Sequence, residues 1–165
     1  FGCNLVGYDK VPSDRCRELG MKYVELPELF ASSDIISLHC PLTPDTRHMI
    51  NADTIAQMKK GVMMINTSRG AVIDTLALIA GLKNGHVGHV GLDVYEEEAD
   101  VFFEDLSSEV IPDDILSRLL TFPNVLITGH QAFFTEDALT CIAETTMQNI
   151  SDIERSGSCS NEVTR

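Results

Sequence analysis

The chain has 165 residues, of which 44% are hydrophobic and 22% charged, a balance typical of one globular domain and unlike that of disordered or collagen-like chains. Acidic residues number 25 against 12 Lys and Arg, and the formal net charge of −13 argues against nucleic acid or an anionic membrane surface as a partner. No apolar run is long enough to span a bilayer, and the five scattered cysteines, without a CxxC pair, indicate reduced thiols of a cytoplasmic protein rather than disulfides or a metal site.

The first residues predict that further chain precedes Phe1. The sequence opens without Met and without the charged and apolar regions of a signal peptide. Gly2 stands where a helix would end, and an apolar strand follows at once. We therefore expect a longer parent protein.

Short apolar runs alternate with helical stretches along the rest of the chain. The apolar runs predict six strands, at residues 5–8, 23–26, 35–40, 62–66, 87–95 and 125–128. Helical segments are expected at residues 14–19, 27–31, 51–60 and 75–82, the last with Asp74 as its N-cap. Continuous apolar strands that alternate with helices are typical of βαβ units, so we expect a parallel sheet covered on both faces.

The last helix has the clearest period. Thr135 is a suitable N-cap, and Glu136 and Asp137 in the first turn favour the helix dipole. An apolar stripe follows at helical spacing, made of Ala138, Leu139, Ile142, Ala143, Thr146, Met147, Ile150 and Ile153. The polar tail from Ser156 is expected to be flexible.

Between residues 93 and 114 the sequence carries many acids and no base. Most of this run is interpreted as a solvated loop. The residues directly after the strand predicted at 87–95 are different, because open α/β sheets build their sites at the carboxyl ends of strands.

Two strand ends suggest contacts with a dinucleotide. Asp9 follows the first strand, where an acid can accept hydrogen bonds from the ribose hydroxyls of NAD and repel the 2′-phosphate of NADP. Alone, such an Asp is more often an ordinary strand-ending residue. Pro41 and Pro44 make a rigid turn after the strand at 35–40, which can form an apolar wall for a cofactor ring or can be a simple strand exit.

Two further strand ends carry candidate catalytic groups. Arg69 follows the strand at 62–66, and a guanidinium there can hold a carboxylate with two hydrogen bonds, although an ordinary surface Arg also fits the local pattern. His130 follows the last strand, and a His beside a carboxylate is suited to proton transfer near neutral pH. The other histidines are interpreted as structural, namely His39, His48, His86 and His89.

Four motifs occur in this order along the chain: HCPLTPDT at 39–46, INTSRGAVID at 65–74, GLDVYEEE at 91–98 and TGHQAFFT at 128–135. Together they resemble the D-isomer-specific 2-hydroxyacid dehydrogenases, over about residues 1–153. The VFFED stretch at 101–105 and the segment that contains GHQAFF are most similar to the fermentative D-lactate dehydrogenases of that family.

The resemblance implies the catalytic residues. Arg69 would bind the substrate carboxylate, His130 would be the acid/base, and Glu98 would pair with His130, with Glu96 and Glu97 as lesser candidates. In that mechanism the nicotinamide supplies a hydride to C2 of a 2-keto acid, while His130 donates a proton to the developing alkoxide.

The resemblance also implies the residues that bind NAD. Asp9 would bind the adenosine ribose, and Asp93 would accept a hydrogen bond from the carboxamide. The remaining residues would border the cofactor or its nicotinamide ribose: Cys40, Pro41, Thr46, Thr67 and Ser68. No metal is implied.

The implied fold is α/β, an incomplete Rossmann-type doubly wound parallel sheet that lacks its first βα unit and the GxGxxG turn. Residues 1–134 would form a partial NAD-binding domain, 135–155 a helix that returns to the substrate domain, and 156–165 a flexible tail. Because the missing strand is the central one, we expect a gap between the strands near Leu5 and Ile35, with exposed apolar edges. We also expect this chain alone to bind NAD poorly and to turn over little or nothing.

The implied function is that of an NAD-dependent oxidoreductase whose parent protein reduces pyruvate to D-lactate, as a homo-oligomer in the cytoplasm. A phosphoglycerate- or hydroxypyruvate-type substrate is the rival within this class. The alternative class is a non-catalytic dinucleotide-sensing or partner-binding protein on the same fold, since such relatives can keep the same Arg, Glu and His.

Overall fold

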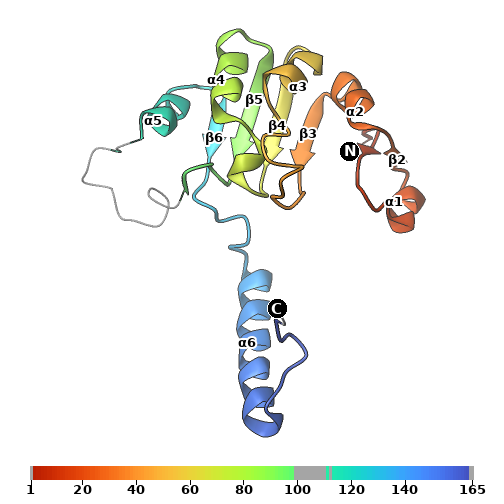
Figure 1. Ribbon diagram of the computed structural model, residues 1–165, viewed down its shortest axis with the longest axis vertical. Helices are drawn as coiled ribbons and strands as arrows, with labels where there is room; N and C mark the ends of the chain where they lie inside the picture. The colour runs from red at the N-terminus through yellow and green to blue at the C-terminus, as the bar shows by residue number, and fades with distance from the viewer. Residues whose placement is uncertain (1, 99–110, 112, 164–165) are drawn as a thin grey trace. The chain divides into compact units, whose positions relative to one another are not determined.

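The computed structural model of the protein describes residues 2–98, 111 and 113–163. The chain forms two compact units, Phe1–Gly129 and His130–Arg165. The six strands found among these residues belong to the first unit, and the second unit is built on one long helix (Figure 1).

The elements of the first unit alternate as the sequence predicts. Its strands are β1 (Val6–Gly7), β2 (Lys22–Tyr23), β3 (Ile35–Leu38), β4 (Val62–Asn66), β5 (Val87–Leu92) and β6 (Val125–Ile127). Its helices are α1 (Asp14–Glu18), α2 (Leu26–Ser32), α3 (Ala52–Gln57), the short 3₁₀ helix η1 (Gly70–Val72), α4 (Thr75–Lys83) and α5 (Asp114–Leu120). The order of the predicted elements is confirmed, several of them end earlier than expected, and η1 and α5 were not predicted.

The strands of the first unit form two separate parallel sheets. β1 pairs with β2, whereas the second sheet has the order β3-β4-β5-β6. No ladder joins β1 to β3 among the described residues, so the expected gap between these two strands is confirmed. In the larger sheet Leu38 lies opposite Asn66, and Asn66 lies opposite Leu92, which places the carboxyl ends of β3, β4 and β5 side by side. The α/β class with parallel pairing is therefore confirmed.

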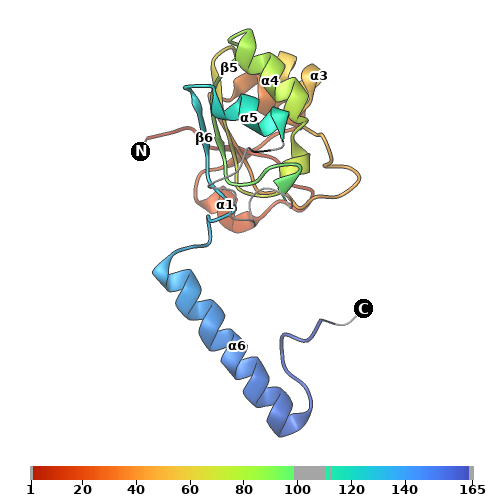
Figure 2. The same ribbon diagram turned by 90° about the vertical axis from the view of Figure 1, so that its left-hand side faces the viewer.

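The four-stranded sheet is covered on one face within the first unit. Ile36 and Leu38 of β3 are buried, whereas Ile35, which lies on the opposite face of the strand, is 59% exposed, and Leu126 of β6 is 68% exposed. The buried side chains join a core with α3, α4 and α5, which lie on one side of this sheet (Figure 2). Among the described residues the predicted cover on both faces is thus found on one face only, because consecutive crossovers from β3 to β6 place their helices on the same side.

Two predicted helix starts are confirmed by their hydrogen bonds. The Asp74 carboxylate accepts from the backbone N–H groups of Leu76 and Ala77 at 3.0 and 3.1 Å, which fixes the beginning of α4. In the second unit the Thr135 hydroxyl accepts from the Ala138 N–H at 3.2 Å and begins α6 (Glu136–Ser156).

The apolar stripe predicted for α6 is present and exposed. No residue of α6 is buried, and Ile142, Met147 and Ile153 are all more than half exposed. The helix ends at Gly157, whose φ of 78° is readily adopted by glycine. Across the described parts of the chain, no helix combines the length and the apolar character needed to cross a membrane.

The acidic run differs from the prediction at its carboxyl end. Asp113 and Asp114 begin α5, and the Asp113 carboxylate accepts from the N–H groups of Ile115 and Leu116 at 2.8 and 2.9 Å. These acids are helix-starting residues rather than loop residues, because a carboxylate at this position satisfies free N–H groups. Most of the run, residues 99–110 and 112, lies outside the described residues.

Candidate active site

The loop after β4 presents Arg69 and is held by a buried amide. Asn66, the last residue of β4, is 1% exposed; its Oδ1 accepts from the Ser68 N–H at 3.1 Å and its Nδ2 donates to the Arg69 carbonyl at 3.0 Å. The guanidinium of Arg69 stays exposed and donates to the Ser68 carbonyl at 2.6 Å. Asn66 was not among the predicted site residues, although a polar residue that ends the apolar run VMMIN was a usable signal.

A cleft lies where the loops after β3 and β4 meet. The Ser68 hydroxyl donates to the Cys40 carbonyl and so joins the two loops. The cleft has a volume of about 520 Å³, within the range of small-molecule sites. Its lining contains five of the predicted site residues and two neighbours: Cys40, Pro41, Thr67, Ser68 and Arg69, with His39 and Leu42.

The loop after β3 contributes His39, Cys40, Pro41 and Leu42 to the cleft. Burial raises the pKa of the Cys40 thiol, and the negative charge of Asp9 adds to the shift, so the thiol is held neutral. The Thr46 hydroxyl accepts from the Thr43 N–H at 2.8 Å and donates to the Pro41 carbonyl at 2.6 Å. Within the structure Thr46 therefore shapes the loop that carries Cys40 and Pro41, and its predicted contact with a cofactor stays a prediction.

Asp9 lies just beyond the end of β1 with its side chain exposed. Its carboxylate accepts from the Val11 N–H at 2.8 Å, which tightens the loop after β1. The next residue, Lys10, pairs with Asp45 of the loop after β3 at 2.6 Å. This ion pair links the loops that follow the carboxyl ends of β1 and β3, which belong to the two different sheets.

The turn after β5 carries two of the predicted acids. Asp93 is 5% exposed; its carboxylate accepts from the Thr128 hydroxyl at 2.5 Å, and its N–H donates to the Asn66 carbonyl at 2.9 Å. Glu98 is half-buried and accepts from the Tyr95 N–H at 3.1 Å. These bonds hold the turn against the ends of the neighbouring strands β4 and β6.

The loop that carries Arg69 packs directly against the turn that carries Glu98. A Cβ added at Gly70 would overlap the backbone carbonyl group of Tyr95 and the amide nitrogen of Glu96. Only glycine permits this approach of the two backbones. Arg69 and Glu98 therefore lie on adjoining loops, as the catalytic assignment requires.

His130 is the first residue of the second unit. It is half-buried, and its φ of 54° is an uncommon conformation for a residue with a side chain. That its imidazole meets Arg69 and Glu98 stays a prediction.

Other candidates have clear structural roles. The imidazole of His86 bonds the Met58 carbonyl at 2.9 Å, which agrees with its structural interpretation. Glu96, a lesser candidate for pairing with His130, bonds His48 at 2.6 Å instead. Among the described residues, no group of three or more His, Cys, Asp or Glu side chains is arranged to hold a metal ion.

Comparisons with known protein families and with curated proteins point to the same family. Residues 1–132 match the family described as D-isomer specific 2-hydroxyacid dehydrogenase, NAD binding domain. D-lactate dehydrogenase from Escherichia coli (strain K12) is 55% identical over 163 residues, which cover 99% of this chain and 50% of that protein.

Solved structures agree with this result. A D-lactate dehydrogenase from Treponema pallidum has a TM-score of 0.94 at 39% identity, and the match covers 99% of this chain and 49% of that one. D-lactate dehydrogenase from Aquifex aeolicus, solved with NAD and lactic acid, has a TM-score of 0.86 at 35% identity, covering 99% and 51%.

The chain spans about half the length of the curated relatives that it matches. The predicted resemblance to this family is confirmed. The chain belongs to the D-isomer specific 2-hydroxyacid dehydrogenases, and its residues 1–132 match their NAD-binding domain.

Proposed function

We propose that this chain works, joined to the rest of a longer protein, as the NAD-binding half of an enzyme that reduces pyruvate to D-lactate. The observation that carries the proposal is the cleft of about 520 Å³, in which Arg69 lies with the cofactor candidates Cys40, Pro41, Thr67 and Ser68. The choice of substrate is supported by relatives that are themselves D-lactate dehydrogenases, one of them solved with NAD and lactic acid.

The residues at the strand ends fit the nicotinamide and ribose parts of NAD. Pro41 offers apolar surface to a flat ring, and Thr67 offers a hydroxyl to the adjoining ribose. Asp93, buried at the end of β5, supplies an acceptor for the carboxamide, and Asp9 supplies one for the adenosine ribose. We assign the contacts to the pyrophosphate to the half of the whole protein that corresponds to the part of the relatives outside the match.

The chemistry divides among three side chains and the cofactor. NADH, when bound, supplies the hydride that reduces the keto carbon. Arg69 binds the substrate carboxylate through paired, charge-assisted hydrogen bonds. His130 holds the proton that passes to the developing alkoxide oxygen, and Glu98 orients the imidazole.

The second unit serves the proposed enzyme through α6. Its exposed apolar stripe, which includes Leu139, Ile142 and Ile150, is suited to pack against the half of the protein that lies outside this chain. We also propose that the whole protein is a homo-oligomer.

A chimera tests the proposal. In it, this chain replaces the matched half of the Escherichia coli D-lactate dehydrogenase, a relative 55% identical to it. We expect NADH-dependent reduction of pyruvate, measured as loss of absorbance at the NADH band. The substitution His130→Gln should lower kcat by about 10²–10⁴ while NADH binding, followed by fluorescence titration, is kept.

The outcomes separate the alternatives. A folded chimera that binds NADH but reduces no 2-keto acid would support the non-catalytic dinucleotide sensor instead. Faster turnover of hydroxypyruvate than of pyruvate would move the assignment to the rival substrate class.

A further inference from the structure

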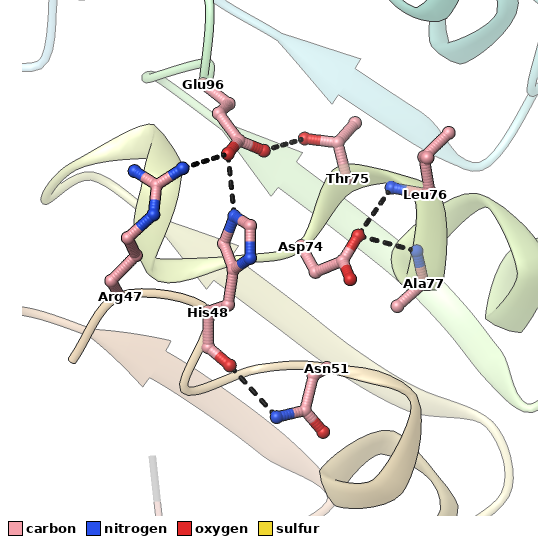
Figure 3. A network of polar contacts seen from close by, with 8 residues as sticks. All are labelled: Arg47, His48, Asn51, Asp74, Thr75, Leu76, Ala77 and Glu96. Carbon is pink, nitrogen blue, oxygen red and sulfur yellow. Dashed lines mark hydrogen bonds and ion pairs between the residues drawn. The ribbon is translucent and has the colours of Figure 1, made fainter. Parts of the chain in front are cut away.

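A carboxylate outside the proposed catalytic trio lies at the centre of a polar network (Figure 3). One Glu96 oxygen, Oε1, lies 2.6 Å from Nε2 of His48 and 3.4 Å from the Arg47 guanidinium. The other oxygen accepts from the Thr75 hydroxyl at 3.3 Å. A carboxylate can only accept, so Nε2 of His48 carries the hydrogen in this contact.

The network joins three segments that are distant in the sequence. Arg47 and His48 follow β3, Thr75 begins α4, and Glu96 lies in the turn after β5. The Glu96 side chain is 16% exposed, and of the two partners of its Oε1 the His48 side chain is 37% and the Arg47 side chain 58% exposed, so the contact to His48 is the better shielded of the two.

His48 is itself fixed by its backbone. Its φ of 49° is unusual for a residue with a side chain. The conformation is held on both sides, because the His48 N–H donates to the Ala71 carbonyl at 2.8 Å and its carbonyl accepts from Asn51 Nδ2 at 3.0 Å. His48 is therefore a rigid partner for the Glu96 carboxylate.

The network acts on both loops that carry proposed catalytic groups. Glu98 lies two residues beyond Glu96 in the same turn, and the backbone of Glu96 abuts Gly70, the neighbour of Arg69. The bond from His48 to Ala71 reaches the same loop from its other end. A displacement of Glu96 would shift the turn of Glu98 and the loop of Arg69 together.

We propose that Glu96, held by His48 and Thr75, is a positioning residue that sets the geometry between Arg69 and Glu98. The inference rests on the proposed dehydrogenase function. A displacement of a catalytic group by about 1 Å can lower the rate of the catalysed reaction about 100-fold. Loss of the network should therefore have a measurable effect on turnover.

The test uses three substitutions in the chimera defined above. Glu96→Ala removes every contact of the carboxylate, and we expect kcat with pyruvate to fall about 10- to 100-fold with the KM for NADH within about twofold. Glu96→Gln keeps an oxygen that can accept from His48, so it should retain most of kcat. The control Asp34→Asn removes an exposed ion pair to Lys59, of 2.9 Å, that lies just before β3, and it should leave kcat unchanged.

A second measurement does not depend on turnover. Hydrogen–deuterium exchange should quicken in the segment 93–98 of the Glu96→Ala variant, without a matching change in β4 or in the Asp34→Asn control. If Glu96→Ala keeps kcat within twofold, or if Glu96→Gln is equally damaging, the proposal is wrong.

The experiment distinguishes failure of the dehydrogenase assignment from failure of the proposal about Glu96. If the unmodified chimera reduces no 2-keto acid, the dehydrogenase assignment fails and exchange alone decides the role of Glu96. Local quickening at 93–98 then supports the positioning role, and unchanged or uniformly faster exchange overturns it.

Discussion

The substitution Gly70→Ala tests whether the contact between the Arg69 loop and the Glu98 turn matters. The added Cβ falls well inside the 3.0 Å that real Cβ atoms keep from other atoms, and the atoms it meets are backbone atoms of Tyr95 and Glu96, which cannot rotate away. The two segments must separate by on the order of 1 Å, which is enough to lower kcat/KM for pyruvate about 100-fold. Overpacking of this kind also destabilises by about 1–3 kcal/mol.

The assay compares Gly70→Ala with Gly91→Ala in the same chimera. At Gly91 the new Cβ meets the end of the flexible Ile65 side chain at 2.9 Å, so the structure can adjust and activity should stay within about threefold. Steady-state kinetics and urea unfolding measure both effects. Equal behaviour of the two variants, in rate and in stability, would refute the argument that this backbone contact sets the site.

Three further predictions concern other parts of the site. Asn66→Ala should lower the unfolding free energy of the chimera by about 2–4 kcal/mol, since a buried amide with two hydrogen bonds is lost, and a urea-unfolding change below about 0.5 kcal/mol would contradict this. Because burial raises the pKa of Cys40, less of its thiol is ionised at pH 8, so iodoacetamide should label it more slowly than the exposed Cys3 and Cys141 and faster as the pH rises. Mass spectrometry reads the labelling, and equal rates at the three sites would show that Cys40 is not shielded. The chain alone should bind NADH weakly and reduce pyruvate little or not at all; activity near that of the Escherichia coli relative would show that this half suffices.

Much of the fold was predictable because its strands are nearly continuous apolar runs. Residues 62–66 were predicted with their observed bounds, and the caps Asp74 and Thr135 were identified from the residue type in front of a helix. Strand ends were less certain, because Asp93 to Tyr95 continue an apolar-rich pattern after β5 has ended at Leu92.

The site was predictable only where the chemistry lies in short motifs. Cys40, Pro41, Thr67, Ser68 and Arg69 come from two such motifs, and the pairing of β3 with β4 brings them into one cleft. The contact between His48 and Glu96 spans 48 residues and depends on the approach of two loops, which no local pattern encodes. The same reason applies to the close backbone packing at Gly70.

The strand order of the larger sheet has a consequence for how this half is assembled. In β3-β4-β5-β6 each strand after β3 pairs with the strand made immediately before it during synthesis. The sheet can therefore grow by successive docking of βα units onto an existing edge, because each pairing joins strands that are neighbours along the chain. β1 and β2 belong to the other sheet, so the four-stranded sheet can form its pairings without them.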